Sequence, residues 1–280
     1  MSAPALRDQL EERGLFARKA LGQHFLLDLN LTAKIARLAG VAPGTPVIEV
    51  GPGPGGLTRP LLEAGADPLI AIERDARFVA HLRDLEGPAA GRLYLVEADA
   101  LQVDEAALLA AAGAQGPALI VSNLPYNVGT PLLIKWLKAG AWRGPMTLMF
   151  QTEVAERTCA RPGTAAYGRL AVLVAAQMQA RIVLHVPARA FTPPPKVESA
   201  VVRFDPLDPE HRFDDLAALE RVTQAAFGQR RKMLRGALKA LGSAEALCEA
   251  AGIAATARAE EIAPEGFFAL ARAWRAQTPP

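Results

Sequence analysis

The sequence predicts an α/β fold, in which a parallel sheet is covered by helices on both faces and is followed by a small all-helical domain. Three observations support this prediction. Short apolar runs alternate with helix-like segments over most of the chain, a glycine-rich turn follows the first of these runs, and the last quarter is rich in Ala and Leu with helical spacing. Strands that alternate with helices are typical of parallel sheets buried on both faces.

The apolar runs define the expected strands. They are Val47–Val50, Leu69–Ile72, Leu93–Val96, Ala118–Val121 and Met146–Phe150, with Leu170–Val174 and Ser199–Phe204 as later strands of the same sheet. Segments with helical character lie between them, namely Asp75–Leu85, Asp104–Ala112 and Thr130–Leu137. Asp75 and Asp104 are expected to be helix N-caps, because a carboxylate can accept hydrogen bonds from the first turn of a helix.

The composition changes after Pro206. From Asp214 to Ala276 the pattern is helical, with Gly242, Gly252 and Pro264 as interruptions. The predicted domains are therefore an N-terminal extension over residues 1–25, an α/β domain over 26–206 and a helical domain over 207–280.

Length and composition exclude several classes of protein. With ~150 residues per domain as a guide, 280 residues suit one large and one small domain. No apolar run reaches the ~18 residues of a membrane span, and the mixed-charge N-terminus does not look like a secretory signal, so a cytoplasmic protein is expected. Two Cys without CxxC spacing and four His without paired spacing predict neither a disulfide framework nor a metal site.

Charge is unevenly distributed, although the net charge is only +2. Between Ala106 and Val197 nine Lys and Arg residues stand against Glu153 and Glu156, and between Arg221 and Ala244 six stand against none. Such separation favours a polyanionic partner such as nucleic acid. For a single cluster a solvated helix face would be the better explanation, but two clusters in one chain favour nucleic acid.

The glycine-rich turn spans Glu49–Thr58, directly after the first expected strand. Glycines allow the backbone to approach a ligand closely. The turn lacks the Gly-Lys-Ser or Gly-Lys-Thr of a phosphate-binding loop and departs from the GxGxxG spacing of dinucleotide sites. Four glycines favour a ligand loop, whereas one or two would indicate a plain turn.

Two acidic residues follow the next strands. Glu73 is placed to accept both ribose hydroxyls of an adenosine, and Asp99 to accept the adenine amino group. Either residue alone would be explained as a helix cap. With the glycine loop they predict an adenosine pocket without a phosphate grip, which suits S-adenosylmethionine better than NAD or ATP.

The run Asn123-Leu124-Pro125-Tyr126 ends another expected strand. The Asn oxygen and a backbone carbonyl of the Leu-Pro unit can accept the two hydrogens of a planar amine and direct its lone pair at an electrophilic methyl group. Tyr126 offers a flat face to a base removed from its stack. The alternative is an ordinary strand-to-helix turn.

Two further segments carry candidate substrate contacts. In the proline-rich run Phe191–Ser199, Phe191 is expected to pack on the target base opposite Tyr126, and Lys196 to meet phosphate; a polyproline linker is the alternative. The basic stretch Phe227–Arg235 is predicted to lie on one helix and to contact nucleic acid. Its candidate RNA-binding residues are Arg230, Arg231, Lys232 and Arg235.

These segments together resemble the ribosomal RNA small-subunit (16S) adenine N6,N6-dimethyltransferases, the KsgA/RsmA family. The matching segments run in family order from about Arg18 to Glu265: 19–26, 49–58, 73–75, 99–101, 123–127, 151–157, 166–170, 191–203 and 226–232. The resemblance implies a Rossmann-like S-adenosylmethionine-dependent methyltransferase sheet with a small helical C-terminal domain. It also implies a monomer without a metal that dimethylates N6 of two adjacent adenines near the 3′ end of 16S rRNA, in the small ribosomal subunit or its precursor.

The resemblance also implies roles for single residues. His24, Leu26, Gly51, Glu73, Asp99 and Asn123 would bind the cofactor. Asn123, Leu124, Tyr126 and Phe191 would position the target adenine. The chain departs from the family where His24 replaces the common Asn, and where Ala98 replaces Gly.

Rival functions follow from the same residues. An erythromycin-resistance type of 23S rRNA adenine methyltransferase shares the cofactor and amine motifs. A ribosome-assembly factor with secondary catalysis would use the basic clusters for binding alone. An NAD-dependent oxidoreductase would need a pyrophosphate grip, which the glycine spacing does not favour.

Overall fold

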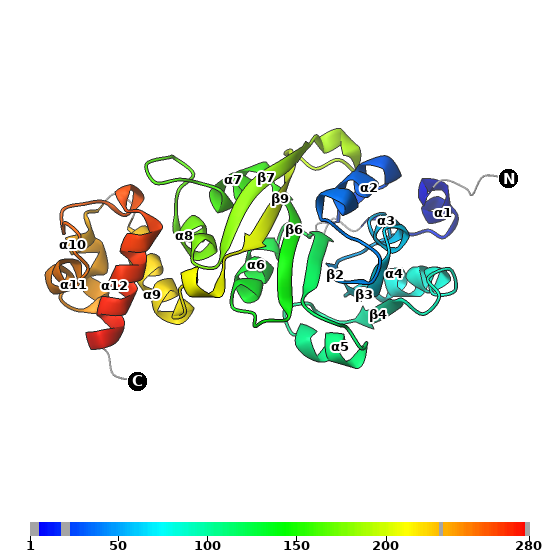
Figure 1. The fold of residues 1–280 in the computed structure, drawn as a ribbon. Helices are drawn as coiled ribbons and strands as arrows, with labels where there is room; N and C mark the ends of the chain where they lie inside the picture. The colour runs from blue at the N-terminus through cyan, green and yellow to red at the C-terminus, as the bar shows by residue number, and fades with distance from the viewer. Residues whose placement is uncertain (1–5, 18–22, 230–231, 278–280) are drawn as a thin grey trace. The chain divides into compact units, whose positions relative to one another are not determined.

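The computed structural model describes residues 6–17, 23–229 and 232–277. It divides into two compact units (Figure 1). The first unit contains residues 1–155 and 181–205, and the second contains residues 156–180 and 206–280. The second unit therefore takes in 156–180, a segment that the sequence pattern assigned to the α/β domain.

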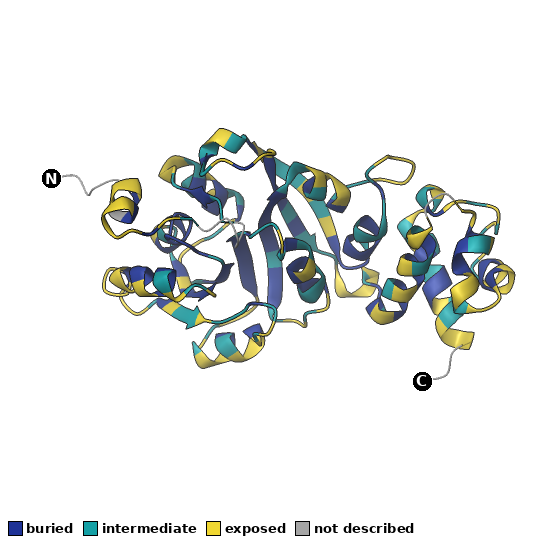
Figure 2. Cartoon of the chain, turned by 180° about the vertical axis from the view of Figure 1, so that it is seen from behind, coloured by how far each residue is buried: buried dark blue, intermediate teal, exposed yellow. Residues whose placement is uncertain are grey.

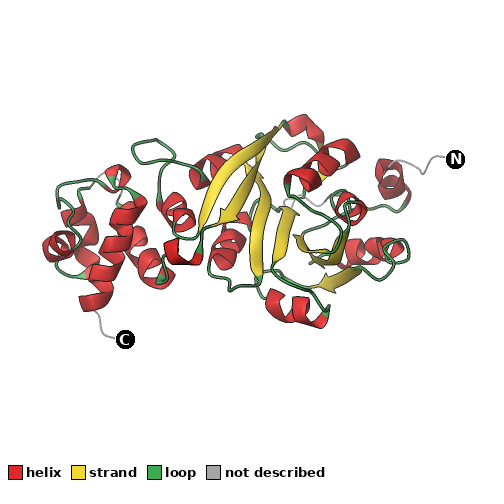
Figure 3. Ribbon diagram, viewed as in Figure 1, coloured by secondary structure: helices red, strands yellow, loops and turns green. Residues whose placement is uncertain are grey.

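The first unit is built on a seven-stranded sheet with the order β4-β3-β2-β5-β6-β9-β7 (Figure 3). Its strands are β2 (Thr45–Val50), β3 (Ala66–Glu73), β4 (Leu93–Glu97), β5 (Ala118–Asn123), β6 (Arg143–Gln151), β7 (Met178–Val186) and β9 (Ser199–Pro206). Strands β2 to β6 pair in parallel, and β9 pairs antiparallel with β6. The predicted α/β class and six of the seven predicted strands are confirmed.

Both faces of the central strands of the sheet, such as β2 and β5, are buried, as the continuous apolar runs predict (Figure 2). Successive residues of a strand point to opposite faces, and Val47 and Ile48 of β2 both have no exposed surface. Val47 belongs to a core cluster with Ile35 and Leu61, from two helices. On other helices, Leu109 and Trp136 are buried as well.

The three helical segments predicted between the strands begin and end close to their predicted limits, as α4 (Ala76–Leu82) with η2 (Arg83–Leu85), α5 (Glu105–Ala111) and α6 (Gly129–Leu137). The structure adds α2 (Leu29–Leu38), α3 (Thr58–Glu63), α7 (Thr152–Thr158) after β6, and η3 (Ala188–Ala190). The predicted N-caps are confirmed, because Asp75 accepts a hydrogen bond from the amide of Arg77 and Asp104 accepts one from that of Ala107.

A small two-stranded sheet joins distant parts of the first unit. Strand β1 (Phe25–Leu26) pairs antiparallel with β8 (Phe191–Thr192), with Leu26 opposite Phe191. The N-terminal segment also contains α1 (Leu6–Glu12), and Leu10 packs with Phe25 in a separate apolar cluster.

The second unit is helical. Its helices are α8 (Arg169–Ala175), η4 (Pro209–His211), α9 (Leu216–Gly228), α10 (Leu234–Ala237), η5 (Leu238–Leu241), α11 (Ala244–Ala250), η6 (Ala259–Glu261) and α12 (Pro264–Gln277). Helix α9 packs on α8, α10 and α12. Leu219 and Phe267 are completely buried there.

Two expectations were wrong. Leu170–Val174 is not a strand but most of α8, since a short, continuously apolar run suits a buried helix as well as a buried strand. Phe227–Arg235 is not one helix: α9 ends at Gly228, Met233 forms an isolated bridge with Arg258, and α10 starts at Leu234. Backbone pairing at Met233 interrupts the helical pattern.

Candidate functional site

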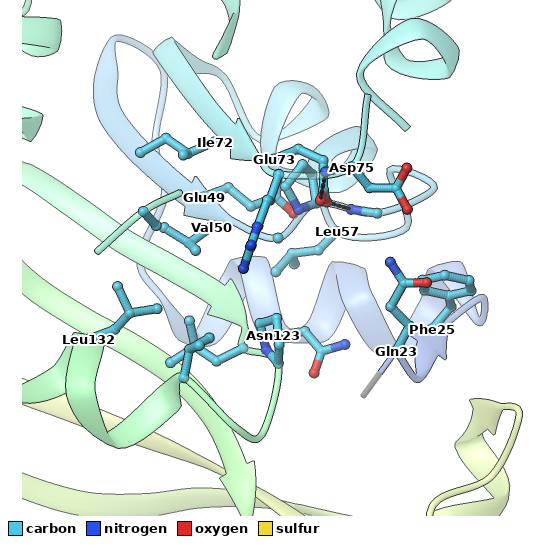
Figure 4. A pocket seen from close by; sticks show the side chains of 18 of the residues that line it. Gln23, Phe25, Glu49, Val50, Leu57, Ile72, Glu73, Asp75, Asn123 and Leu132 are labelled. Carbon is cyan, nitrogen blue, oxygen red and sulfur yellow. Dashed lines mark hydrogen bonds between the residues drawn. The ribbon is translucent and has the colours of Figure 1, made fainter. Parts of the chain in front are cut away.

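A cavity of about 530 Å³ opens at the carboxyl ends of the central parallel strands (Figure 4). This volume is typical of small-molecule sites, and the carboxyl edge of a parallel sheet is where α/β proteins bind ligands. The cavity is lined by residues 23–26, 49–54, 56–57, 72–77, 98–101, 123–128 and 132. All of these residues belong to the first unit.

The structure brings together most of the predicted site residues. His24, Leu26, Gly51, Glu73, Asp99, Asn123, Leu124 and Tyr126 all line the cavity. Phe191 does not line it: the residue is 3% exposed and belongs to the core cluster around β1 and β8, so its ring is not open to a base in this structure. The pairing of β1 with β8, which buries Phe191, was not foreseen.

The predicted nucleic-acid contacts lie elsewhere. Lys196 is an exposed residue of the first unit, and Lys232 and Arg235 are exposed residues of the second unit. Arg230 and Arg231 lie outside the described residues.

The glycine loop touches two other walls of the cavity through its backbone. Gly51 has a φ of +68°, and a Cβ there would stand 3.2 Å from Cδ of Pro125. A Cβ on Gly56 would stand 2.1 Å from the carbonyl oxygen of Leu26, closer than any side chain can come. The loop therefore packs directly on the turn after β5 and on β1.

Glu73 ends β3 with its carboxylate fixed by backbone donors (Figure 4). Oε2 accepts from the amide of Gly53 at 3.1 Å, and Oε1 accepts from the amide of Asp75 at 2.9 Å. Burial raises the pKa of Glu73, and these backbone hydrogen bonds lower it in part. Each oxygen keeps a second acceptor position, so the carboxylate is arranged to receive a diol such as that of a ribose.

The loop after β4 carries Asp99, and Lys135 of α6 fixes the backbone of this loop by hydrogen bonds. Nζ of Lys135 donates to the carbonyl oxygens of Ala100 at 2.7 Å and Val103 at 2.6 Å, and to Oε1 of Glu105 at 2.8 Å. Hydrogen bonds from a charged donor are stronger than neutral ones. They fix the backbone that presents Asp99 to the cavity.

Asn123 lies between the N-terminal segment and the predicted amine site. Its Nδ2 donates to the carbonyl oxygen of His24 at 3.3 Å. A carbonyl can only accept, so this contact fixes the orientation of the amide and leaves Oδ1 as the atom that can accept a hydrogen from an amine.

Tyr126 is held by contacts at its ring and its hydroxyl. The imidazole of His24 stacks on the ring, with the centroids 5.6 Å apart and an angle of 28° between the planes. The Tyr126 hydroxyl lies 2.7 Å from Oγ of Ser199, a completely buried residue of β9. Burial raises the pKa of Tyr126, so the phenol is neutral near pH 7. Nδ1 of His24 lies 2.8 Å from the carbonyl oxygen of Pro193 and therefore carries a hydrogen.

Three residues of the site were missed by sequence reasoning. Lys135 gave no signal, because its contacts depend on how α6 packs against the loop after β4. Ser199 stood in the proline-rich run without a role, and Glu49 was treated only as the start of the glycine turn. Within the described residues, no His, Cys, Asp and Glu side chains gather in a group that could hold a metal ion. No helix in this part of the chain is long and apolar enough to cross a membrane.

The chain is similar in sequence to known proteins. A family model described as ribosomal RNA adenine dimethylase matches residues 14–275. Ribosomal RNA small subunit methyltransferase A of Phenylobacterium zucineum is 61% identical over 275 residues, which cover 98% of this chain and 94% of that protein. The protein of the same description from Caulobacter vibrioides is 61% identical over 257 residues, which cover 92% and 97%.

Solved structures are similar in fold. The crystal structure of a dimethyladenosine transferase from Plasmodium falciparum gives a TM-score of 0.72 at 24% identity, covering 88% of this chain and 96% of that one. The crystal structure of 23S rRNA methyltransferase ErmE gives a TM-score of 0.63 at 25% identity, covering 89% and 98%.

Replacing Lys135 with Met should weaken the binding of an adenosine ligand, because two charge-assisted hydrogen bonds then no longer hold the loop that carries Asp99. We expect the Kd of S-adenosylmethionine to rise about 10-fold, the equivalent of ~1.4 kcal/mol, in calorimetric titration. Lys34→Met, at an exposed position of α2, is the matched control and should bind as the parent does. An unchanged Kd for Lys135→Met would mean that Asp99 is positioned without this lysine.

Proposed function

This chain belongs to the ribosomal RNA adenine dimethylase family, and we propose that it dimethylates N6 of two adjacent adenines near the 3′ end of 16S rRNA. It is an S-adenosylmethionine-dependent methyltransferase with a Rossmann-like fold. The proposed substrate is the small ribosomal subunit or its precursor, and the proposed place of action is the cytoplasm. One observation supports this function most: Glu73 and Asp99, the carboxylates predicted to bind adenosine, line one cavity with Asn123–Tyr126.

The residues of the cavity fit S-adenosylmethionine, which supplies a methyl group activated on a sulfonium sulfur. Glu73 is fixed in position to accept the ribose hydroxyls, and Asp99 faces the same cavity from the neighbouring loop. Gly51 adds no side chain of its own to the cavity wall, where a Cβ would stand 3.2 Å from Cδ of Pro125. His24 and Leu26 complete the wall on the N-terminal side.

The role of the protein itself is to hold the target amine in line with the methyl group that the amine attacks. In this proposal, Oδ1 of Asn123 and the carbonyl of Leu124 accept the two hydrogens of N6, so that its lone pair points at the methyl group. The imidazole that stacks on Tyr126 supports the view that this ring holds a flat heterocycle. Ser199 holds the Tyr126 hydroxyl and so keeps the ring in place.

Incubating the protein with small subunits that lack these methyl groups, together with labelled S-adenosylmethionine, tests the proposal. Mass mapping of the nucleosides should find dimethyladenosine near the 3′ end of 16S rRNA. Asn123→Ala should lower the rate at least ~100-fold, since misplacing the nucleophile is costly. Asn30→Ala, at an exposed position outside the cavity, should retain the parental rate. Label in 23S rRNA, or in neither RNA, would overturn the proposed substrate.

Glu73→Ala should weaken the binding of S-adenosylmethionine and leave RNA affinity unchanged, because the carboxylate faces the cofactor part of the cavity. Losing hydrogen bonds to a charged group costs roughly 1.5–3 kcal/mol, so Kd should rise about 10- to 100-fold. Glu97→Ala removes the exposed acid of β4 that lies opposite Glu73 in the sheet and serves as control. Equal calorimetric affinities for the two variants would rule out the ribose contact.

The exposed cations of the second unit should bind RNA phosphate. Replacing both Lys232 and Arg235 with Ala should weaken RNA binding and reduce its dependence on salt, by about one slope unit for each phosphate that is no longer neutralised. Affinities measured between low and physiological salt give this slope. Replacing Lys34 and Arg37 of α2 provides a control with the same change in charge. If the variant without Lys232 and Arg235 keeps the parental dependence of RNA affinity on salt, these two cations do not contact RNA phosphate.

A further inference from the structure

Glu49 is a buried acid in the cavity to which the proposed function gives no role. Glu49 is the penultimate residue of β2 and lines the cavity, yet only 1% of its surface is exposed (Figure 4). Its Oε2 makes no hydrogen bond to any described residue. A buried carboxylate without partners is costly, so such a group is expected to be neutral or to await a ligand.

The other buried acids of the first unit differ from Glu49 in this respect. Glu73 accepts two backbone hydrogen bonds, and Glu105 accepts from Lys135 and from Nε1 of Trp136. These donors offset part of the cost of burying a charge at Glu73 and Glu105, whereas Oε2 of Glu49 has no such donor among the described residues. Among the buried acids that the structure describes, Glu49 is thus the one with a carboxylate oxygen that lacks a hydrogen-bond partner.

The charged neighbours of Glu49 do not compensate for its burial. Glu73, on the adjacent strand β3, adds a second negative charge, and the hydroxyl of Thr58 on α3 is the polar neighbour. The guanidinium of Arg59, also on α3, is influenced by Glu63 and Asp84 instead. Burial, opposed in part by Thr58 and reinforced by Glu73, raises the pKa of Glu49 to about 8. The carboxyl group is therefore mostly protonated at neutral pH in the protein without a ligand.

We propose that Glu49 is a further cofactor-binding residue, which recognises the positive charge of S-adenosylmethionine by releasing its proton when the cofactor enters. The inference rests on the proposed function, because it requires a cationic ligand in this cavity. The O–H bond of the carboxyl group breaks, the proton passes to the buffer, and the carboxylate remains as the counter-charge. No bond of the cofactor changes in this step.

The physical reason is that a cation lowers the pKa of a nearby carboxyl group, and does so strongly where water is excluded. Binding should therefore tighten as pH rises towards the pKa of the free protein. Since that pKa is about 8, we expect the Kd to fall about 10-fold per pH unit between pH 6 and 7.5 and to level off above pH 8.

Calorimetric titration of the full chain with S-adenosylmethionine in phosphate and in Tris at pH 7.4 measures the proton. The two buffers differ in ionisation enthalpy, so the difference in observed heat gives the number of protons released. We expect about 0.8 protons for the parent protein, from a pKa of about 8. Glu49→Gln should bind without this release, while Glu97→Gln, at an exposed acid of β4, should keep it.

Thr58→Val provides a second variant that retains the acid. Because the Thr58 hydroxyl lowers the pKa of Glu49, removing it should shift the pH dependence of Kd to higher pH. Equal heats in the two buffers for the parent protein, or the same release in Glu49→Gln, would overturn the inference. A parent protein that fails to bind S-adenosylmethionine at any pH would instead overturn the proposed function.

Discussion

Close backbone contact around the glycine loop is the constraint on which the cavity depends. The loop after β2 lies so near the turn after β5 that a Cβ on Gly51 would touch Pro125, and so near β1 that a Cβ on Gly56 would overlap the carbonyl of Leu26. The glycine loop, the turn after β5 and strand β1 therefore lie too close together for a side chain at Gly51 or Gly56. This contact sets the distance between the residues proposed to bind the cofactor and those proposed to hold the amine.

Much of the fold was predictable, because strands buried on both faces have sequences of continuous apolar residues. The same property explains the error at Leu170–Val174, where the run is too short to distinguish a helix from a strand. Strand β7 was not predicted: it mixes exposed and half-buried positions, as expected for a strand at the edge of a sheet, and carries no such run. Local pattern therefore identified the strands of the sheet, including β4 at one edge, but not β7 at the other edge.

The candidate site was predictable where a residue follows a strand. Glu73 and Asn123 end β3 and β5, Asp99 follows β4, and parallel strands bring their carboxyl ends to one edge. Lys135 and Ser199 act through contacts between segments far apart in the sequence, which no local pattern encodes. Phe191 shows the converse: its motif was recognised, but the pairing of β8 with β1 buries its ring.

The pairing of β1 with β8 also affects the order in which parts of the chain can fold during synthesis. The wall formed by His24 is held by the carbonyl of Pro193, a residue 169 positions later in the chain, and β1 has its partner in β8. During synthesis from the N-terminus, the strands β2 to β6 emerge before this closure is possible. A nascent chain therefore has its glycine loop and its carboxylates long before it has a finished ligand site, and contacts of such long range are slow to form.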